Sequence, residues 1–274
     1  MPGGNAEVLR VGVAGLGAIG MPVARWLDDG VSGLTLSGVS AGNKDRAVGR
    51  VADFRAPPPV LDLAELVKAS DVLVEVLPPD KFLELAEPTV DAGKKLIVLT
   101  LTSLLPRLDL VDRARASGAQ IIAATGALVG FDAVRAAAKG EVASVVMKTR
   151  KPPEGLKKAA FVVEQGINLD NLPEPLCLYS GSVRDAAAKF PANVNVAVAL
   201  ALAGIGPDRT EYEIWADPAM ERNTHQIIVD ADSTRFEMNI AGVPTEENPA
   251  TGKLTPLSVM ATLERLVAPL TVGT

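Results

Sequence analysis

Near the start of the chain, three glycines have the spacing of a phosphate-binding turn. Gly15, Gly17 and Gly20 form a Gly-x-Gly-x-x-Gly pattern directly after a valine-rich apolar run. A helical pattern follows at once, so the turn joins a buried strand to a helix. The glycines permit a tight bend and a close approach of the backbone to a pyrophosphate, and the helix N-terminus supplies free N–H groups. The turn, with Ala18 and Ile19 inside it, therefore predicts a dinucleotide-phosphate site; the alternative is an ordinary glycine-rich turn.

A second strand is predicted at residues 34–40, and the residues after it bear on the choice of dinucleotide. A site selective for NAD usually has Asp or Glu there to bind the ribose hydroxyls. This chain instead has Asn43, Lys44 and, two residues on, Arg46. We therefore predict that Asn43 and Lys44 contact the cofactor and that NADP is accepted alongside NAD. The alternative is that Lys44 and Arg46 merely begin a solvated helix.

His225 is the only histidine of the chain, so any acid–base chemistry by an imidazole near neutral pH must use it. It lies early in a predicted strand, which would support it rigidly, although a lone histidine can also be purely structural. Arg222 and Asn223 precede it, and a guanidinium group matches the two oxygens of a carboxylate. Arg222 and Asn223 are therefore predicted to bind a substrate carboxylate.

Two asparagines, Asn193 and Asn195, stand directly before a strongly apolar helix predicted over residues 196–203. One would be the N-cap of this helix and the other would be available to a ligand. The alternative is that both serve only the helix end.

The elements that position these residues follow the alternation of an α/β fold. Apolar runs at 71–77, 96–101 and 120–125, separated by helical patterns, predict further parallel strands. Ligands of doubly wound sheets lie outside the carboxyl ends of the strands, so residues 75–80 and 100–103 should border the nicotinamide half of the cofactor. For Glu75 the alternative is a helix cap or a surface acid.

After residue 125 the pattern changes, and we expect a second domain. It contains predicted strands at 141–149, 176–180, 210–216, 224–230 and 235–240, and the last two alternate polar and apolar residues as in a hairpin. The fold class is thus α/β, with a doubly wound parallel sheet and a second α/β sheet domain. The predicted domains are 1–125 for the dinucleotide, 126–243 for catalysis, and a C-terminal segment, 244–274, whose helix at 254–267 returns to the first domain.

Composition limits the possible partners. The chain has 274 residues, of which 48% are hydrophobic and 22% charged, and its net charge is -6. This charge offers no basic field for nucleic acid or acidic lipid. One cysteine and one histidine exclude a thiolate or histidine-rich metal site. The N-terminus lacks the features of a signal peptide and no apolar run approaches a membrane span, so we expect a cytoplasmic protein without membrane contact.

Several separated motifs resemble the L-aspartate dehydrogenase family. They cover nearly the whole chain in the family's order and comprise the segments 15–20, 125–127, 190–197, 216–218, 222–227, 247–249 and 254–258. This chain departs from the family pattern at residues 100–105, where a glycine-containing Ser-x-Gly-Ala-Leu turn is expected. The departure bears on the substrate end of the pocket more than on the cofactor.

The resemblance implies an enzyme that interconverts L-aspartate and oxaloacetate plus ammonia through iminosuccinate, with NAD or NADP, often to supply NAD synthesis. The family's catalytic histidine falls on His225, and its cofactor-contacting alanine and asparagine fall on Ala127 and Asn195. The first domain would be a Rossmann domain. A homodimer is plausible because the predicted hairpin offers a sheet edge and an apolar face.

Two other functions stay open on the sequence. The first is a reductase of another imine or carbonyl acid, of the dihydrodipicolinate reductase or homoserine dehydrogenase kind. The second is a non-catalytic sensor of NADP(H), which would bind cofactor without turnover and would have no need of the His225 segment.

Overall fold

The computed structural model describes residues 8–191, 194–248 and 251–273. The chain divides into two compact units, and we describe each by itself. Unit 1 comprises the described residues up to Ala124 together with Thr255–Thr271. Unit 2 comprises Thr125–Leu254 together with Val272 and Gly273.

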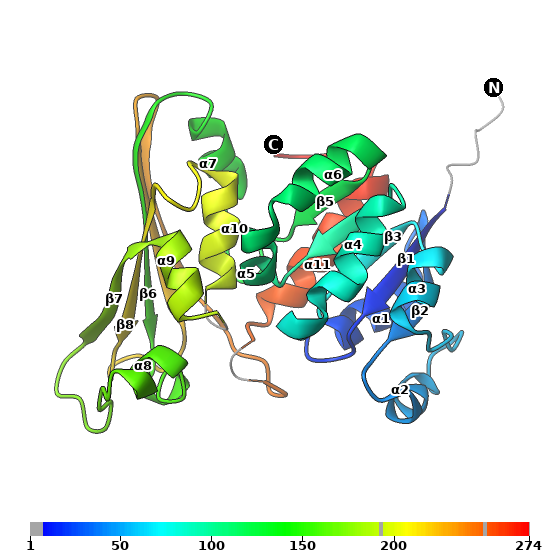
Figure 1. Ribbon diagram of the computed structural model, residues 1–274, viewed down its shortest axis with the longest axis horizontal. Helices are drawn as coiled ribbons and strands as arrows, with labels where there is room; N and C mark the ends of the chain where they lie inside the picture. Colours follow the sequence, from blue (N-terminus) through cyan, green and yellow to red (C-terminus); the bar gives the residue numbers. More distant parts are fainter. Residues whose placement is uncertain (1–7, 192–193, 249–250, 274) are drawn as a thin grey trace. The chain divides into compact units, whose positions relative to one another are not determined.

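Unit 1 is built on a five-stranded parallel sheet with the strand order β2-β1-β3-β4-β5 (Figure 1). The strands are β1 (Leu9–Ala14), β2 (Leu34–Ser40), β3 (Val72–Glu75), β4 (Lys95–Val98) and β5 (Gln120–Ala123). The helices between them are α1 (Gly20–Asp29), α2 (Lys44–Val51), α3 (Leu63–Ala69), α4 (Phe82–Asp91), α5 (Leu101–Leu104) and α6 (Asp109–Ser117). The predicted doubly wound parallel sheet is confirmed. The order of the strands reverses between β1 and β3, which is the point where such sheets bind their ligands.

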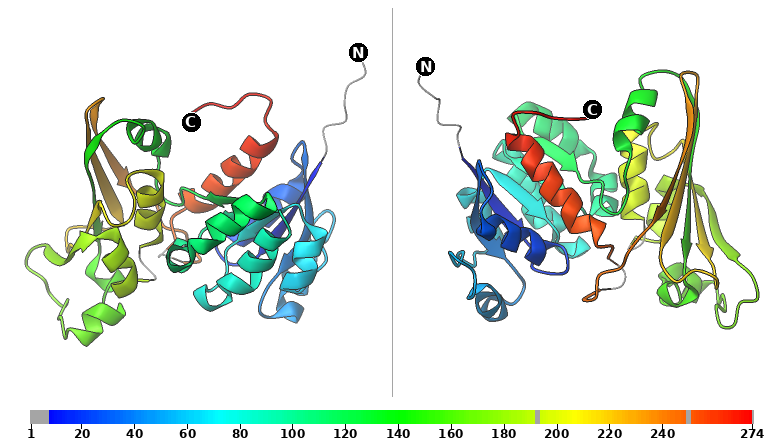
Figure 2. Two further views of the ribbon diagram at one scale, coloured as in Figure 1. Left: turned by 45° about the horizontal axis from the view of Figure 1, so that its top comes forward. Right: turned by 180° about the vertical axis from the view of Figure 1, so that it is seen from behind.

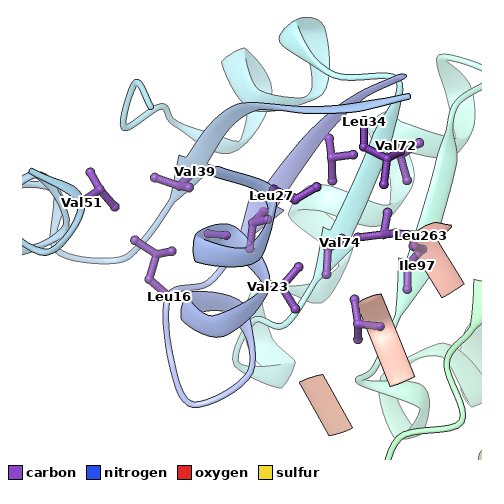
Figure 3. Close-up of a cluster of buried hydrophobic side chains, with 14 of the residues drawn as sticks. Leu16, Val23, Leu27, Leu34, Val39, Val51, Val72, Val74, Ile97 and Leu263 are labelled. Carbon is purple, nitrogen blue, oxygen red and sulfur yellow. The ribbon is translucent and has the colours of Figure 1, made fainter. Parts of the chain in front are cut away.

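The two faces of the unit 1 sheet are both buried, which explains the unbroken apolar runs in its strands. Val72, Leu73 and Val74 of β3 have no exposed surface. Val72 and Val74 belong to one cluster with Val23 and Leu27 of α1 (Figure 3). This core fixes the position of the turn between β1 and α1.

The last helix, α11 (Leu254–Val267), closes the same core. Val259 and Leu263 are fully buried in the cluster, and Figure 2 shows α11 lying along the unit 1 sheet. We expected the returning segment to start at residue 244, whereas residues 244–254 belong to unit 2. The reason is that this segment continues the pairing of its own unit: Pro244 forms a bridge with Gly252, and the N–H of Lys253 donates to the carbonyl of Val243 over 2.7 Å.

Unit 2 contains a mixed five-stranded sheet with the order β10-β9-β6-β8-β7. Its strands are β6 (Val142–Lys151), β7 (Leu176–Ser182), β8 (Thr210–Ala216), β9 (Thr224–Ala231) and β10 (Arg235–Ala241). Strands β6 and β8 are parallel, and β9 and β10 form the predicted antiparallel hairpin. The helices are α7 (Phe131–Ala137), α8 (Ala160–Glu164), α9 (Val183–Lys189) and α10 (Asn195–Ala203).

One face of this sheet lies under α10. A Cβ atom at Gly204, directly after α10, would be 3.9 Å from Cγ2 of Val145, so the odd-numbered residues of β6 point toward this helix. The nine residues of α10 are about as long as the stretch of β6 from Val145 to Thr149. Because α10 returns along β6 toward the start of the parallel strand β8, its first turn lies toward the Thr149 end of that face (Figure 1).

Candidate active site

The glycine turn of unit 1 has the geometry that its sequence predicts. Gly15 has φ +106°, and a Cβ atom there would be 2.4 Å from the carbonyl oxygen of Val76. A Cβ atom at Gly20 would be 1.8 Å from the carbonyl oxygen of Gly15. Both positions therefore require glycine for the packing of α1 on the strands.

Gly17 differs from the other two glycines, because a Cβ atom there would meet nothing within 4 Å. Packing therefore does not explain this glycine, whereas a pyrophosphate that approaches the backbone does. The residues present fit a dinucleotide, with an open backbone at Gly17 and the N-terminus of α1 beside it. Ala18 and Ile19 are half-buried and lead directly into the helix.

Two contacts hold the turn in place. The N–H of Gly15 donates to the carbonyl of Ser40 at the end of β2, over 2.8 Å. The guanidinium group of Arg50, on α2, donates to the carbonyl of Leu16. The sequence reading missed Arg50, because the pairing depends on how α2 packs beside the turn.

The segment after β2 begins a solvated helix, as the alternative reading stated. Asn43 is the N-cap of α2, and its side-chain oxygen accepts from the N–H of Arg46 over 2.9 Å. Asn43, Lys44 and Arg46 are all exposed. This helix cap is compatible with the predicted contact of Asn43 and Lys44 with the cofactor.

Glu75, at the end of β3, is fully buried and is not the surface acid of the alternative reading. Its carboxylate accepts from the hydroxyl of Thr100 over 2.8 Å, from the N–H of Thr100 over 3.0 Å and from the N–H of Leu77 over 2.8 Å. Burial raises its pKa.

These bonds also correct the predicted strand at 96–101, which ends at Val98 in the structure. The N–H groups of Leu99 and Thr100 turn to the Glu75 carboxylate instead of continuing the sheet, and Leu101–Leu104 forms the short helix α5.

In unit 2, Ala127 and the start of α10 lie close together. Ala127 follows Gly126 in a turn closed by the N–H of Leu128, which donates to the carbonyl of Thr125. A Cβ atom at Gly126 would be 3.5 Å from a methyl of Val196, the second residue of α10.

Asn195 is the first residue of α10, one position earlier than predicted, and it is not the N-cap, which is Val194. Asn193 lies outside the described residues. The structure thus brings Ala127 and Asn195 to one region of unit 2.

His225 lies in β9 on the face of the sheet that α10 covers. It pairs with Thr149 of β6, and Nδ1 of His225 lies 2.9 Å from the hydroxyl oxygen of Thr149. This bond orients the ring and leaves Nε2 for proton transfer. His225 is 6% exposed, and burial together with the charge of Lys151 lowers its pKa to about 4. The imidazole is therefore neutral at neutral pH and can accept a proton.

Lys151 was not among the predicted site residues. It lies two residues after Thr149 in β6, so both side chains are on the face that carries His225. Lys151 is half-buried, and burial lowers its pKa to about 8. The signal in the sequence is the alternation along β6. Met147 and Thr149 are buried, and Lys151, two residues on, places a cation on the same face.

The two residues predicted to bind a carboxylate lie before β9. Asn223 is half-buried, and its carbonyl accepts from the N–H of Gly242, which extends the hairpin by one pair. Arg222 is exposed. The structure therefore brings Asn223 next to the His225 strand, while Arg222 faces solvent at the same end.

The described part of the chain holds no group of three or more side chains suited to a metal ion, and none of its helices is long and apolar enough to cross a membrane. The described residues thus provide an open glycine turn at the start of α1 in unit 1, and in unit 2 a buried histidine bonded to a threonine hydroxyl.

Comparisons with known proteins agree with this division. Residues 132–266 match the profile of the family described as aspartate dehydrogenase, C-terminal, and residues 15–124 match that of the homoserine dehydrogenase NAD-binding domain. The L-aspartate dehydrogenase of Bradyrhizobium diazoefficiens is 51% identical over 97% of this chain and 94% of its own. L-aspartate dehydrogenase 3 of Bordetella bronchiseptica is 49% identical over 98% of this chain and 99% of its own.

Among solved structures, the aspartate dehydrogenase of Thermotoga maritima has the same fold, with a TM-score of 0.75 over 97% of this chain and 99% of that chain at 22% identity. The matches to these two relatives cover 97% and 98% of this chain and therefore extend over both units. The chain therefore belongs to the L-aspartate dehydrogenase family.

Proposed function

We propose that this protein interconverts L-aspartate and oxaloacetate plus ammonia, through iminosuccinate, with NAD or NADP as the cofactor. The observation that carries the proposal is the His225 cluster, in which a buried histidine is oriented by Thr149 and kept neutral. The names and high identity of the curated relatives support the substrate, and the match to an NAD-binding domain supports the cofactor.

Different residues of the chain would bind the cofactor and transfer the proton. The glycine turn and the N-terminus of α1 bind and orient the cofactor through backbone N–H groups, and the bound nicotinamide supplies the hydride chemistry. Nε2 of neutral His225 accepts a proton from the water that attacks the imine. It returns this proton to the departing nitrogen in the direction of aspartate oxidation. We propose that Ala127 and Asn195 also contact the cofactor and that Arg222 and Asn223 contact a substrate carboxylate.

The test of the function is the consumption of NADPH and NADH with oxaloacetate and a high concentration of ammonium. We expect turnover that requires ammonium and yields L-aspartate. Cofactor binding without turnover would contradict the proposal. Activity on another imine or carbonyl acid would then indicate a related reductase, and no activity on any such acid would indicate a sensor.

We also propose that NADP is accepted, since Lys44 and Arg46 are exposed at the start of α2 and could contact a 2′-phosphate. Replacing Lys44 by Glu should lower kcat/KM for NADPH about tenfold, with little effect on NADH, because a charge-assisted contact to the phosphate is lost. The control is Lys68→Glu, at the end of α3. Equal changes for both cofactors would contradict a role for Lys44 in the choice.

Finally, we propose a homodimer that works in the cytoplasm and supplies NAD synthesis. The support for the dimer is that β10 is an edge strand whose residues alternate between exposed and half-buried. Sedimentation equilibrium should give twice the chain mass, and a monomer at micromolar concentration would contradict this part of the proposal.

A further inference from the structure

Tyr212 is a buried polar residue that the proposed function does not use. It lies in β8 and has no exposed surface. Within the described part of the chain, its hydroxyl makes no hydrogen bond of ordinary geometry. A buried hydroxyl without a partner lowers the stability of the fold, so a role other than packing has to explain why this residue is a tyrosine and not a phenylalanine.

The strand register places Tyr212 on the face of the sheet that carries His225. Tyr212 is the register neighbour of Met147 on β6, and Thr149, two residues further along β6, points to the same side. An aromatic side chain can reach such a diagonal neighbour. The Thr149 hydroxyl is near enough to oppose the rise that burial causes in the pKa of Tyr212. Three polar groups thus lie in a row across three neighbouring strands: the phenol on β8, the Thr149 hydroxyl on β6 and the imidazole on β9.

Mostly apolar side chains surround this row. The register neighbours of Thr149 on β8 and of His225 on β10 are Ile214 and Ile240. No residue of α10 has an ionisable side chain, and the charged residues of α7, α8 and α9 are exposed. Lys151 follows Thr149 on the same face, and its charge acts on the ring of His225. In such surroundings, the direction in which each hydroxyl donates strongly affects its neighbour in the row.

The tautomer of His225 decides whether the ring can act as a base. Nε2 can accept a proton only while the ring proton is on Nδ1. The Nδ1–H group then donates to the oxygen of Thr149, so the proton of the Thr149 hydroxyl has to point away from the ring. The phenol oxygen of Tyr212 is an acceptor for that proton. In the opposite arrangement Thr149 donates to Nδ1, and Nε2 carries the ring proton and cannot accept another.

The same direction of donation stabilises the protonated ring. After Nε2 has taken a proton from the attacking water, both nitrogens carry protons, and Nδ1–H still donates to Thr149. Tyr212 keeps its own proton throughout, because burial raises its pKa to about 12. No proton therefore moves along the row, and Tyr212 acts only on the orientation of the Thr149 hydroxyl.

We propose that Tyr212 is a positioning residue that accepts a hydrogen bond from Thr149 and thereby keeps the ring proton of His225 on Nδ1. This bond is completed when Nδ1 carries the proton. The inference rests on the proposed role of His225 as the base. The phenol then contributes to turnover rather than to the stability of the fold.

The first experiment compares Tyr212→Phe with the matched control Tyr179→Phe, which changes the other tyrosine of the chain. The hydroxyl of Tyr179 donates to the carbonyl of Ser182 over 2.8 Å, so its loss should lower the urea midpoint of unfolding and leave kcat unchanged.

Tyr212→Phe should show the reverse. We expect kcat for ammonium-dependent turnover to fall about threefold to tenfold, as for the loss of one orienting hydrogen bond. The urea midpoint should stay or rise, because the variant removes a buried hydroxyl without a partner. KM for oxaloacetate and the affinity for NADPH should stay within about twofold, since neither ligand contacts the phenol.

A double-mutant cycle tests whether Tyr212 acts through Thr149. Thr149→Val removes the hydroxyl that lies between the phenol and the ring, so Tyr212→Phe should cause no further fall of kcat in that background. A fall of the same size in both backgrounds would overturn the proposed route.

The second experiment measures the tautomer directly and needs no turnover. His225 is the only histidine of the chain, so the nitrogen chemical shifts of tag-free protein labelled in its histidine report this ring alone. At neutral pH we expect the proton on Nδ1 in the wild type. In Tyr212→Phe part of the population should shift to the form with the proton on Nε2.

The outcomes separate this inference from the proposed function. Wild-type protein that does not turn over oxaloacetate with ammonium contradicts the function itself, and the tautomer measurement still tests the row of hydrogen bonds. Wild-type turnover with the ring proton on Nε2 overturns the role of Tyr212 alone. Folded Tyr212→Phe with unchanged kcat and an unchanged tautomer overturns it as well.

Discussion

The glycine turn of unit 1 and the sheet face of unit 2 that carries His225 (the histidine face) are built in different ways. The turn uses backbone atoms of residues that are consecutive in the sequence, from Gly15 to Gly20. The histidine face uses side chains from β6 and β9, and Thr149 and His225 are 76 positions apart. The first site depends on the absence of side chains, and the second depends on which side chains the strand register brings together.

This difference predicts that substitutions at the two sites have different effects on the enzyme. A change in the turn should act on cofactor affinity, because the turn has no group that reacts. A change on the histidine face should act on turnover or on substrate affinity and should leave the cofactor bound.

The largest effect is expected for His225→Gln. Loss of a general acid–base group should lower kcat by about 10²-fold to 10⁴-fold. Steady-state kinetics with oxaloacetate and ammonium measure the loss. A variant that retains more than about half of wild-type turnover would show that His225 is structural.

The glycine turn is tested by the pair Gly20→Ala and Gly17→Ala. In Gly20→Ala the Cβ atom would clash with the carbonyl of Gly15, so we expect loss of cofactor binding with a large loss of stability. In Gly17→Ala the folded state has room for the Cβ atom, so stability should change by less than about 1 kcal/mol while NADPH affinity falls. Isothermal titration and thermal unfolding measure the two quantities. Unchanged affinity in Gly17→Ala would contradict the placement of the phosphates.

The burial of His225 should be visible as pH-dependent stability. Its folded pKa of about 4 is below the ordinary histidine pKa of 6.5, so the unfolded chain binds the proton more readily. Stability is therefore full above about pH 6.5 and falls by about 3 kcal/mol as the pH decreases toward about 4. Urea unfolding of wild type and His225→Gln across this range measures the difference. An identical pH dependence in both would show that His225 does not titrate as described.

The smallest effect is expected for Thr149→Val, which removes the hydroxyl beside Nδ1 of His225. The ring loses one orienting hydrogen bond, which is worth about 1 kcal/mol, so kcat should fall about fivefold. The affinity for NADPH should not change. A fall in NADPH affinity with unchanged kcat would contradict the assignment of Thr149 to the acid–base site rather than to the cofactor site.

The parts that sequence alone could predict are those encoded locally. The glycine spacing identified the turn, the lone histidine identified His225 as the candidate base, and apolar periodicity identified the parallel sheet and the β9–β10 hairpin. The short strand β4 was predicted too long, because its end is set by Glu75 in another strand, which takes the N–H groups of Leu99 and Thr100.

The environment of His225 could not be predicted for the same reason. Thr149 and Lys151 become its neighbours only through the antiparallel register of β6 and β9, and a shift of one residue would turn both to the opposite face. The alternation along β6 shows that they share a face, but it does not show which strand lies beside it.

Cofactor binding and acid–base chemistry should therefore reside in separate sets of residues. One comparison decides this: the dissociation constant of NADPH and the ammonium-dependent turnover, measured together in wild type, Gly17→Val and His225→Gln. We expect Gly17→Val to lose NADPH affinity, and His225→Gln to bind NADPH within about twofold of wild type but to lose turnover. If His225→Gln loses NADPH affinity as much as turnover, the two sets of residues are not separate.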